Sequence, residues 1–349
     1  MDVDIKSESI DVDRPSDVRC SICGNIASFK YRDHPGYQEP ARFDIMYCAN
    51  CDASFAFPME VDNGIYDLIY TNILKAPGYR RYYDYALRVL EQRDPLSYLS
   101  LNEEAYWATN DFLTKFTISK KCRILEVGCG FGYLTYSISR AGYDITGLDI
   151  SKEAVDNATK RYGPHYVCAD INDYVNRNKK QYDVVILTEI IEHIPDIVAF
   201  MKSLDGVVKD DGFIFLTTPN KTAYEDDIIW ETDLPPIHLW WLSKTSVGKI
   251  AEIVGRRAIF TDFSTYNRSH PIRRHRIASD TPTRKATFSP DNKLLLTEDP
   301  HREKSRFSRG FKMLKLKLLS KLLCRFSSRK FDGVERYTLC AVLLKNKVE

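Results

Sequence analysis

The chain lacks any run of about 20 apolar residues, which is the length that a helix needs to cross a bilayer. It also lacks a secretory signal, because it begins with MDVDIKSESIDVD, a polar and acidic stretch. A large charge of one sign is absent as well, since the formal net charge is +2 for 349 residues. We therefore expect a cytoplasmic protein, either free or peripheral on the inner face of the membrane.

The small net charge conceals one strongly basic segment. Residues 267–330 hold 18 Lys and Arg against 5 Asp and Glu, a local charge of +13, and the rest of the chain holds 32 against 43, or −11. Within 302–330, basic residues are interleaved with Leu and Phe, which suits a helix on an anionic membrane surface. A solvated loop is an equal alternative, and nucleic acid is the less favoured partner because stacking aromatic residues are few.

Cysteine is plentiful, with nine residues, but the absence of an export signal argues against a disulfide framework. Two Cys-x-x-Cys pairs, separated by 24 residues, can surround one zinc ion tetrahedrally. The spacing predicts a structural zinc ribbon, because four thiolates leave no open coordination position. Its ligands would be Cys20, Cys23, Cys48 and Cys51. Four other cysteines lie in apolar stretches and are expected to be reduced core residues: Cys122, Cys129, Cys168 and Cys340.

The pattern along the chain predicts four segments. Residues 1–17 read as a disordered tail, 18–60 as the zinc ribbon, and 61–118 as a helical connector or lid rich in tyrosine. From there to residue 349, strand-like and helix-like stretches alternate, which predicts a doubly wound α/β fold with a parallel sheet. The basic insertion, about 266–330, precedes the last strand of this domain.

The most specific motif is ILEVGCGFG, in which an apolar strand runs into Glu126 and then Gly128, Gly130 and Gly132. Glycines at a strand-to-helix turn let the backbone approach a ligand closely, and a helix N-terminus favours polar or anionic groups. A dinucleotide-binding fold would want the third glycine one position later, where Tyr133 stands.

This spacing, followed by Asp149 at the end of the second strand and Asp170 at the end of the third, resembles the class I S-adenosylmethionine-dependent methyltransferases. The resemblance covers about residues 119–265 and the final strand. It implies a Rossmann-like methyltransferase sheet and S-adenosylmethionine as cofactor. The implied cofactor contacts are Gly128, Gly130 and Gly132 for the methionine moiety, Glu126 for the loop and the amino group, Asp149 for the ribose hydroxyls, and Asp170 with the Ile171 backbone for the adenine edge.

The stretch DVVILTEIIEHIPD places Glu189 at the end of the fourth strand, beneath the expected methyl donor. It resembles the corresponding stretch of ubiquinone-biosynthesis O-methyltransferases and small-RNA 2'-O-methyltransferases, in which a Glu-x-x-Glu-His set holds a divalent metal. The resemblance implies Mg²⁺ or Mn²⁺ at Glu189, Glu192 and His193. Two alternatives stay open: His193 acts as a general base without metal, or Glu192 and His193 only hold the loop in place.

His238, in WETDLPPIHLWWLS, belongs to a stretch that resembles the PP-x-H loop of many bacterial methyltransferases. In those proteins the loop closes over the acceptor site. His238 would then be the catalytic base or a fourth metal ligand, and a packed loop histidine is the alternative.

The expected reaction is methylation of an oxygen on a sugar, in a lipid-linked or surface glycan. This rests on the basic segment and on resemblance to bacterial polysaccharide-cluster methyltransferases, which also pair a cysteine-knuckle N-terminus with this domain. The alternatives are an RNA methyltransferase that grips nucleic acid with ribbon and insertion, a quinone-type small-molecule O-methyltransferase, and an interaction module that binds cofactor without turnover. The ribbon holds three basic and three acidic residues between 20 and 51, which counts against RNA.

Overall fold

The computed structural model describes residues 17–223, 234–270, 286–295 and 336–345. The segment 302–330, for which a membrane contact is predicted, lies outside these residues, as does almost all of the predicted tail. Within the described ranges, no helix is long and apolar enough to cross a membrane.

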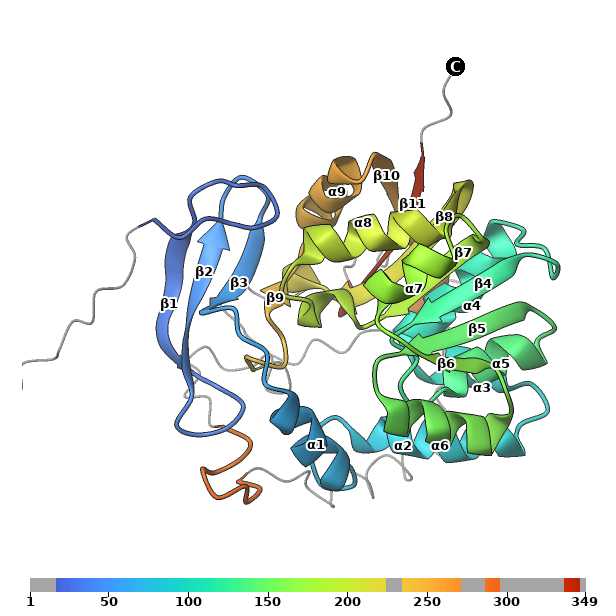
Figure 1. The fold of residues 1–349 in the computed structure, drawn as a ribbon, viewed down its shortest axis with the longest axis horizontal. Coiled ribbons are helices and arrows are strands. Elements are labelled where there is room, and N and C mark those ends of the chain that lie inside the picture. The colour runs from blue at the N-terminus through green and yellow to red at the C-terminus, as the bar shows by residue number, and fades with distance from the viewer. Residues whose placement is uncertain (1–16, 224–233, 271–285, 296–335, 346–349) are drawn as a thin grey trace, which may run out of the picture.

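The larger of two sheets has seven strands in the order β10-β11-β8-β7-β4-β5-β6 (Figure 1). Its strands are β4 (Arg123–Val127), β5 (Asp144–Asp149), β6 (Tyr166–Cys168), β7 (Tyr182–Thr188), β8 (Val208–Pro219), β10 (Arg256–Phe260) and β11 (Thr338–Lys345). The pairs among β4 to β8 are parallel. The central strands are apolar on both faces, as Val184, Val185, Ile186 and Leu187 of β7 are fully buried.

The last strand departs from the predicted parallel sheet. β11 pairs antiparallel with both β8 and β10 and lies between them. The reason is the entry point of the chain: Thr338 pairs with Pro219, so β11 starts at the edge where β8 ends and needs no helical crossover. Its central position follows from its sequence, because Leu339 to Leu343 are buried on both faces.

Helices cover both faces of this sheet, which confirms the doubly wound α/β fold. The core on one face includes Val184 and Ile186 with α4 (Glu104–Lys115), α5 (Tyr133–Arg140) and α6 (Lys152–Tyr162). The core on the other face includes Val185 and Leu187 with α8 (Ile197–Val207) and α9 (Lys244–Ile253). The remaining helices are α7 (Ile171–Arg177), η2 (Ile191–His193), η3 (Lys221–Ala223) and α10 (Ser264–Ser269).

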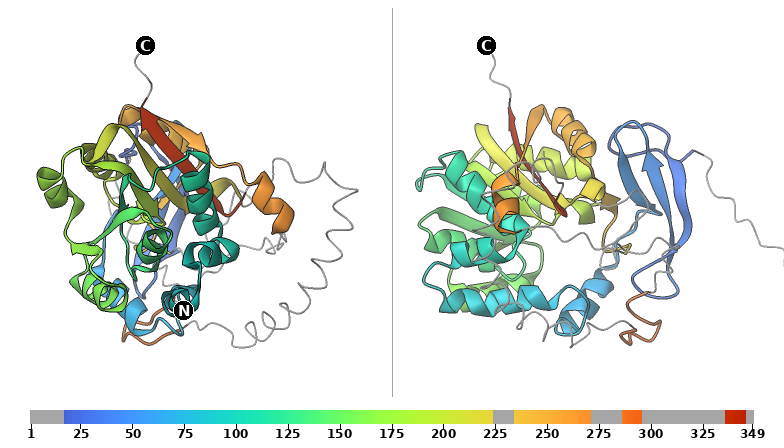
Figure 2. Two further views of the ribbon diagram at one scale, coloured as in Figure 1. Left: turned by 90° about the vertical axis from the view of Figure 1, so that its right-hand side faces the viewer. Right: turned by 180° about the vertical axis from the view of Figure 1, so that it is seen from behind.

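The N-terminal ribbon forms the second sheet, in the order β1-β2-β3-β9. Three antiparallel strands come from the ribbon itself: β1 (Ser28–Pro35), β2 (Arg42–Cys48) and β3 (Ala53–Phe57). The fourth, β9 (Trp240–Trp241), comes from the α/β domain. Figure 2 shows the ribbon at one side of that domain.

Helices join the two sheets, as the tyrosine-rich pattern predicts. They are α1 (Asn63–Thr71), α2 (Arg80–Arg88), η1 (Val89–Glu91), α3 (Pro95–Asn102) and α4. Asp62 caps α1 by accepting from Gly64 N, and Asp94 caps α3 by accepting from Ser97 N.

The four described cysteines outside the ribbon differ in burial. Cys129 and Cys340 are buried, as predicted, whereas Cys122 is only half-buried. The prediction for Cys168 is wrong, because its side chain is exposed. Cys168 ends β6, a three-residue strand at the edge of the sheet, where Val167 is also exposed.

Candidate active site at the carboxyl edge of the sheet

The loop between β4 and α5 is held by its glycines. Gly128, Gly130 and Gly132 have φ of +74°, +47° and +77°, a region that side chains disfavour. A Cβ on Gly128 would lie 2.3 Å from Ile190 Cδ1, so a side chain there would also have to displace Ile190. A Cβ on Gly130 would meet no atom within 4 Å, so the middle of the loop presents its backbone to open space.

Asp149, at the end of β5, supports the same loop. Gly130 N donates to Asp149 Oδ2 at 2.7 Å, and Ser151 N donates to Asp149 Oδ1 at 2.9 Å. Ser151 is the N-cap of α6, as its place in the sequence indicates, and accepts from Ala154 N. Each oxygen of a carboxylate has a further lone pair, so these bonds leave Asp149 able to accept ribose hydroxyls. That role stays a prediction.

Glu126 lies beneath the loop and is 2% exposed. Thr135 Oγ1, on α5, donates a hydrogen bond to its carboxylate. Burial raises the pKa of Glu126 to about 8, against the hydrogen bond from Thr135, which lowers it. The loop-supporting part of its expected role agrees with this position.

Asp170 and Ile171 begin α7 at the same edge. Asp170 is the exposed N-cap and accepts from Asn172 N at 2.7 Å, while the Ile171 side chain is buried. Ile150, which directly follows Asp149, is 72% exposed. The sequence analysis does not single out Ile150, an exposed apolar side chain between Asp149 and the N-cap Ser151.

Glu189 follows β7 in a strained conformation, with φ of +55°. Its backbone N donates to Thr217 O at 3.1 Å, and Thr217 Oγ1 donates to its Oε1 at 2.8 Å. Both contacts direct Glu189 towards the end of β8.

Glu192, His193 and His238 come together although 44 residues separate the first two from the third. One carboxylate oxygen and one ring nitrogen from each histidine lie within 4.8 Å of one another. The two imidazole rings are 4.6 Å apart at their centroids and nearly perpendicular. The structure thus joins His238 to two of the three residues of the predicted magnesium site, whereas Glu189 is not a member of this cluster.

The hydrogen bonds of the cluster fix its chemistry. His193 Nδ1 lies 2.6 Å from Ile237 O, and because a carbonyl only accepts, Nδ1 carries the hydrogen. In the neutral ring Nε2 is then the nitrogen with a lone pair, and it lies 3.9 Å from Glu192 Oε1. Thr218 Oγ1 donates to Glu192 Oε2 at 3.0 Å, and Tyr66 OH lies 3.3 Å from His193 Nδ1.

The burial of His238 bears on whether its ring can act as a base or as a metal ligand. Burial alone lowers the pKa of His238 to about 3, so its ring is neutral at neutral pH. A neutral imidazole is the form that binds metal, whereas a general base works best with a pKa near the working pH. The carboxylate and two imidazoles therefore suit a divalent cation better than they suit catalysis by His238 as a base.

Sequence reasoning missed Thr218 and Tyr66, which contact Glu192 and His193 of this cluster, and Thr217, which binds the neighbouring Glu189. The two threonines had a readable signal, because DGFIFLTTPN ends a buried strand with two hydroxyls. Tyr66 had none, since it is one of eight tyrosines between residues 61 and 117.

The four ribbon cysteines converge on one point. The Sγ atoms lie within 4.8 Å of one another, with 3.6 Å between Cys20 and Cys51 and 3.4 Å between Cys23 and Cys48. A tetrahedral zinc ion with Zn–S bonds of about 2.3 Å needs sulfurs about 3.8 Å apart, so these residues fit zinc. The hydrogen bond between the two thiols lowers the pKa of Cys20 to about 5 and raises the pKa of Cys51.

Comparisons with known proteins agree with this geometry. A family model described as "Methyltransferase domain" matches residues 80–257, which is half of the chain. The chain is 36% identical over 107 residues to a ubiquinone biosynthesis O-methyltransferase of Vibrio vulnificus, covering 28% of this chain and 44% of that protein. It is 32% identical over 109 residues to the protein of the same name from Actinobacillus pleuropneumoniae, covering 29% and 47%. The chain thus spans less than half the length of these relatives.

Two solved structures are similar at low identity. One is a SAM-dependent methyltransferase from Archaeoglobus fulgidus, at 15% identity, covering 69% of this chain and 94% of that chain with a TM-score of 0.40. The other is the plantazolicin methyltransferase BpumL in complex with SAH, at 16% identity, covering 75% and 94% with a TM-score of 0.40.

Proposed function

Because this chain belongs to the methyltransferase domain family, we propose that it transfers the methyl group of S-adenosylmethionine to a hydroxyl oxygen of its acceptor. The observation that carries the choice of oxygen is the cluster of Glu192, His193 and His238 at the edge of the sheet that also holds the glycine loop. The sulfur–methyl bond breaks as the oxygen–methyl bond forms, and S-adenosylhomocysteine and the methylated acceptor are the products.

The residues of the proposed donor half lie at the carboxyl ends of the neighbouring strands β4, β5 and β6. The backbone around Gly130 is open to a ligand, and Asp149 holds it in place. In the proposed mode, the methionine moiety lies along the loop, the ribose binds Asp149, and the adenine lies by Ile150 and Asp170.

The acceptor half must remove a proton from the attacking hydroxyl. We propose that Glu192, His193 and His238 hold a divalent cation such as Mg²⁺ or Mn²⁺, which when bound lowers the pKa of a hydroxyl beside it. His193 presents Nε2, because Nδ1 is engaged with Ile237 O. Glu189 directly follows β7, three residues before Glu192, and in the proposed mode its carboxylate binds the acceptor or its proton. In the ribbon, we propose that Cys20, Cys23, Cys48 and Cys51 hold structural zinc.

The first acceptor that we propose is a sugar hydroxyl, in a lipid-linked or surface glycan. Neighbouring hydroxyls of a sugar can both approach a cation held by Glu192 and the two histidines. The second candidate is a phenol of the quinone type, and the similarity to ubiquinone biosynthesis O-methyltransferases favours it.

The test uses the purified protein, methyl-labelled S-adenosylmethionine and an extract of the source cells. Label is counted in glycolipid, phenolic small-molecule and RNA fractions, with Mg²⁺ supplied or chelated. Label in glycolipid supports the sugar acceptor, label in phenols supports the quinone type, and label in RNA overturns both. Glu192→Gln should abolish transfer whether Mg²⁺ is supplied or chelated, and Glu153→Gln, at an exposed acid on α6, is the matched control and should transfer as wild type does.

A further inference from the structure

One strand of the ribbon sheet comes from the segment that carries His238. β9 pairs antiparallel with β3, with Ser54 opposite Trp241 and Phe55 opposite Trp240. In Figure 1, β9 lies between β3 and the α/β domain. The ribbon therefore continues by backbone pairing into the loop of the active site.

Leu239, the residue after His238, links the ribbon to the turn that carries Glu192 and His193. On the ribbon side, Ala56 N donates to Leu239 O at 2.9 Å. On the other side, Leu239 N donates to Glu192 O at 2.9 Å. A single peptide segment thus bridges β3 and the turn that carries Glu192, and His238 is at its start.

Side chains reinforce this bridge. The rings of Phe55 and Trp240 are 5.2 Å apart at their centroids, and their residues are 2% and 1% exposed. Trp240 Nε1 also donates to Ile194 O at 2.9 Å, just beyond His193. Trp240 therefore contacts the ribbon with its ring and the turn of the cluster with its indole nitrogen.

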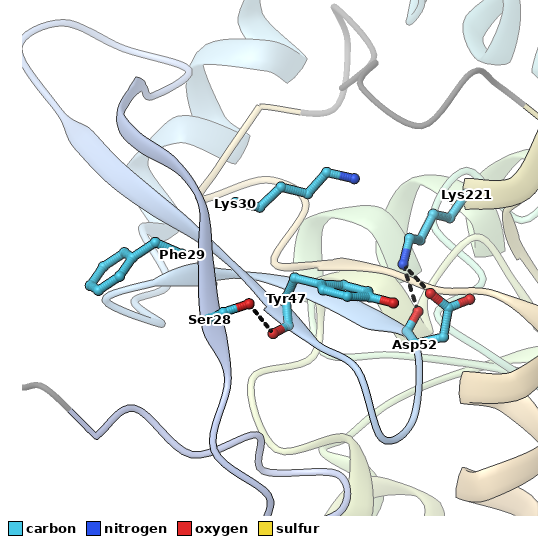
Figure 3. A pocket seen from close by; sticks show the side chains of 6 residues that line it. All are labelled: Ser28, Phe29, Lys30, Tyr47, Asp52 and Lys221. Carbon is cyan, nitrogen blue, oxygen red and sulfur yellow. Dashed lines mark hydrogen bonds and ion pairs between the residues drawn. The ribbon is translucent and has the colours of Figure 1, made fainter.

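A second contact fixes the ribbon at its cysteine knuckle (Figure 3). Asp52, which follows Cys51, accepts from Lys221 Nζ at 2.7 Å through both its backbone oxygen and Oδ1. Ser243 Oγ, at the N-cap of α9, donates to Asp52 O at 3.4 Å. The Lys221 ammonium also lies 4.6 Å from the centre of the Tyr47 ring. Asp52, next to the knuckle, thus contacts Lys221 on one side of the His238 segment and Ser243 on the other.

We propose that the N-terminal ribbon positions the active site, with Phe55 and Ala56 as positioning residues that set His238 beside Glu192 and His193. The inference rests on the proposed function, in which these three residues form the acceptor half of the active site. The knuckle at Cys48 and Cys51 forms the turn between β2 and β3, since Cys48 pairs with Ala53. The order of the ribbon is therefore transmitted along β3 to the His238 segment.

Two variants test the proposal at separate contacts, each with a matched control. Phe55→Ala removes the ring against Trp240, and Phe29→Ala removes a ribbon ring that contacts the Arg32 guanidinium instead. Lys221→Met removes the ion pair with Asp52 without touching the ribbon core, and Lys249→Met removes an exposed ion pair with Glu252 on α9.

Three measurements on the full chain separate positioning from general stability. They are amide hydrogen exchange of the peptide that spans 237–242, the NMR signals of labelled histidines, and calorimetric affinity for S-adenosylhomocysteine. Phe55→Ala should speed exchange in 237–242 about tenfold and move the His193 and His238 signals. Lys221→Met should do the same to a smaller extent. Exchange in β5 and the affinity for S-adenosylhomocysteine should match wild type in both variants and in both controls.

Two outcomes would overturn the proposal. In the first, both test variants leave the 237–242 exchange and the His238 signal as in wild type. In the second, exchange rises by the same factor in β5 and in 237–242, so that the ribbon contributes only general stability. None of the three measurements needs an acceptor, so failure of the O-methyl transfer experiment is recognised separately.

Discussion

Removal of the Asp149 carboxylate should weaken binding of the cofactor while the rest of the fold stays intact. In Asp149→Ala, Gly130 N and Ser151 N lose acceptors that now lie at 2.7 and 2.9 Å. A hydrogen bond to a charged group contributes about 1.5–3 kcal/mol, and Asp149 is half-buried, so we take the lower end for each, or about 3 kcal/mol together. The cofactor would then have to order the glycine loop itself and would also lose its proposed ribose acceptor.

A loss of about 3 kcal/mol in binding free energy corresponds to a dissociation constant that is roughly 150-fold larger. Titration calorimetry with S-adenosylhomocysteine measures it directly. Asp149→Asn keeps one acceptor oxygen and should lose about tenfold. The matched control is Asp144→Ala, at the exposed start of the same strand and therefore at the opposite edge of the sheet. Affinity of Asp149→Ala within about threefold of wild type, with the fold intact by thermal unfolding, would refute the assignment of the donor site.

Three further predictions follow from single residues. Burial raises the pKa of Glu126 to about 8, whereas in the unfolded chain it titrates near 4.5, so folded protein binds this proton more tightly and loses stability as pH rises from 4.5 to 8. Glu126→Gln should therefore raise the Tm more at about pH 8.5 than at about pH 5, and an equal gain at both would contradict the shift. Ile150→Ala should weaken binding of S-adenosylhomocysteine about fivefold, the effect of about 1 kcal/mol of lost apolar contact, with no change in Tm, and unchanged affinity would remove Ile150 from the site. Cys51→Ser should release bound zinc in a colorimetric assay while Cys168→Ser, at an exposed cysteine, retains it; equal zinc in both would refute the ribbon site.

The methyl-donor half of the site could be predicted from the sequence because short, local motifs specify it. An apolar strand, a G-x-G-x-G turn and an acid at the end of the next strand each occupy a few consecutive residues, and parallel strands bring their ends to one edge. The exposure of Cys168 was not accessible, because the apolar YVC looks the same in a central strand as in a three-residue strand at the edge. The antiparallel β11 was missed for a related reason, since strand direction depends on where the chain enters the sheet.

The acceptor side was only partly accessible, because tertiary contacts assemble it. Glu192 and His193 could be read from one stretch, but nothing local shows that His238, rather than Glu189, completes their cluster. β9 has two residues and no periodic pattern, and its partner β3 lies nearly 190 positions earlier in the chain. This pairing depends on tertiary contacts: β9 occupies the edge that β3 would otherwise leave unpaired, and Trp240 is buried against Phe55.

The same contacts argue that ribbon and α/β domain act as one unit. A ribbon attached only through its linker to α1 could be replaced by another module without effect on the site. Here the edge of β3 supplies a backbone donor to the residue after His238, and the cysteine knuckle holds Lys221, just beyond β8. Loss of order at the ribbon should therefore reach the cluster from two directions, through the His238 segment and through the end of the strand that carries Thr217 and Thr218. The glycine loop donates hydrogen bonds to Asp149 and Leu148 of β5, so loss of order at the ribbon should disturb the acceptor half more than the donor half.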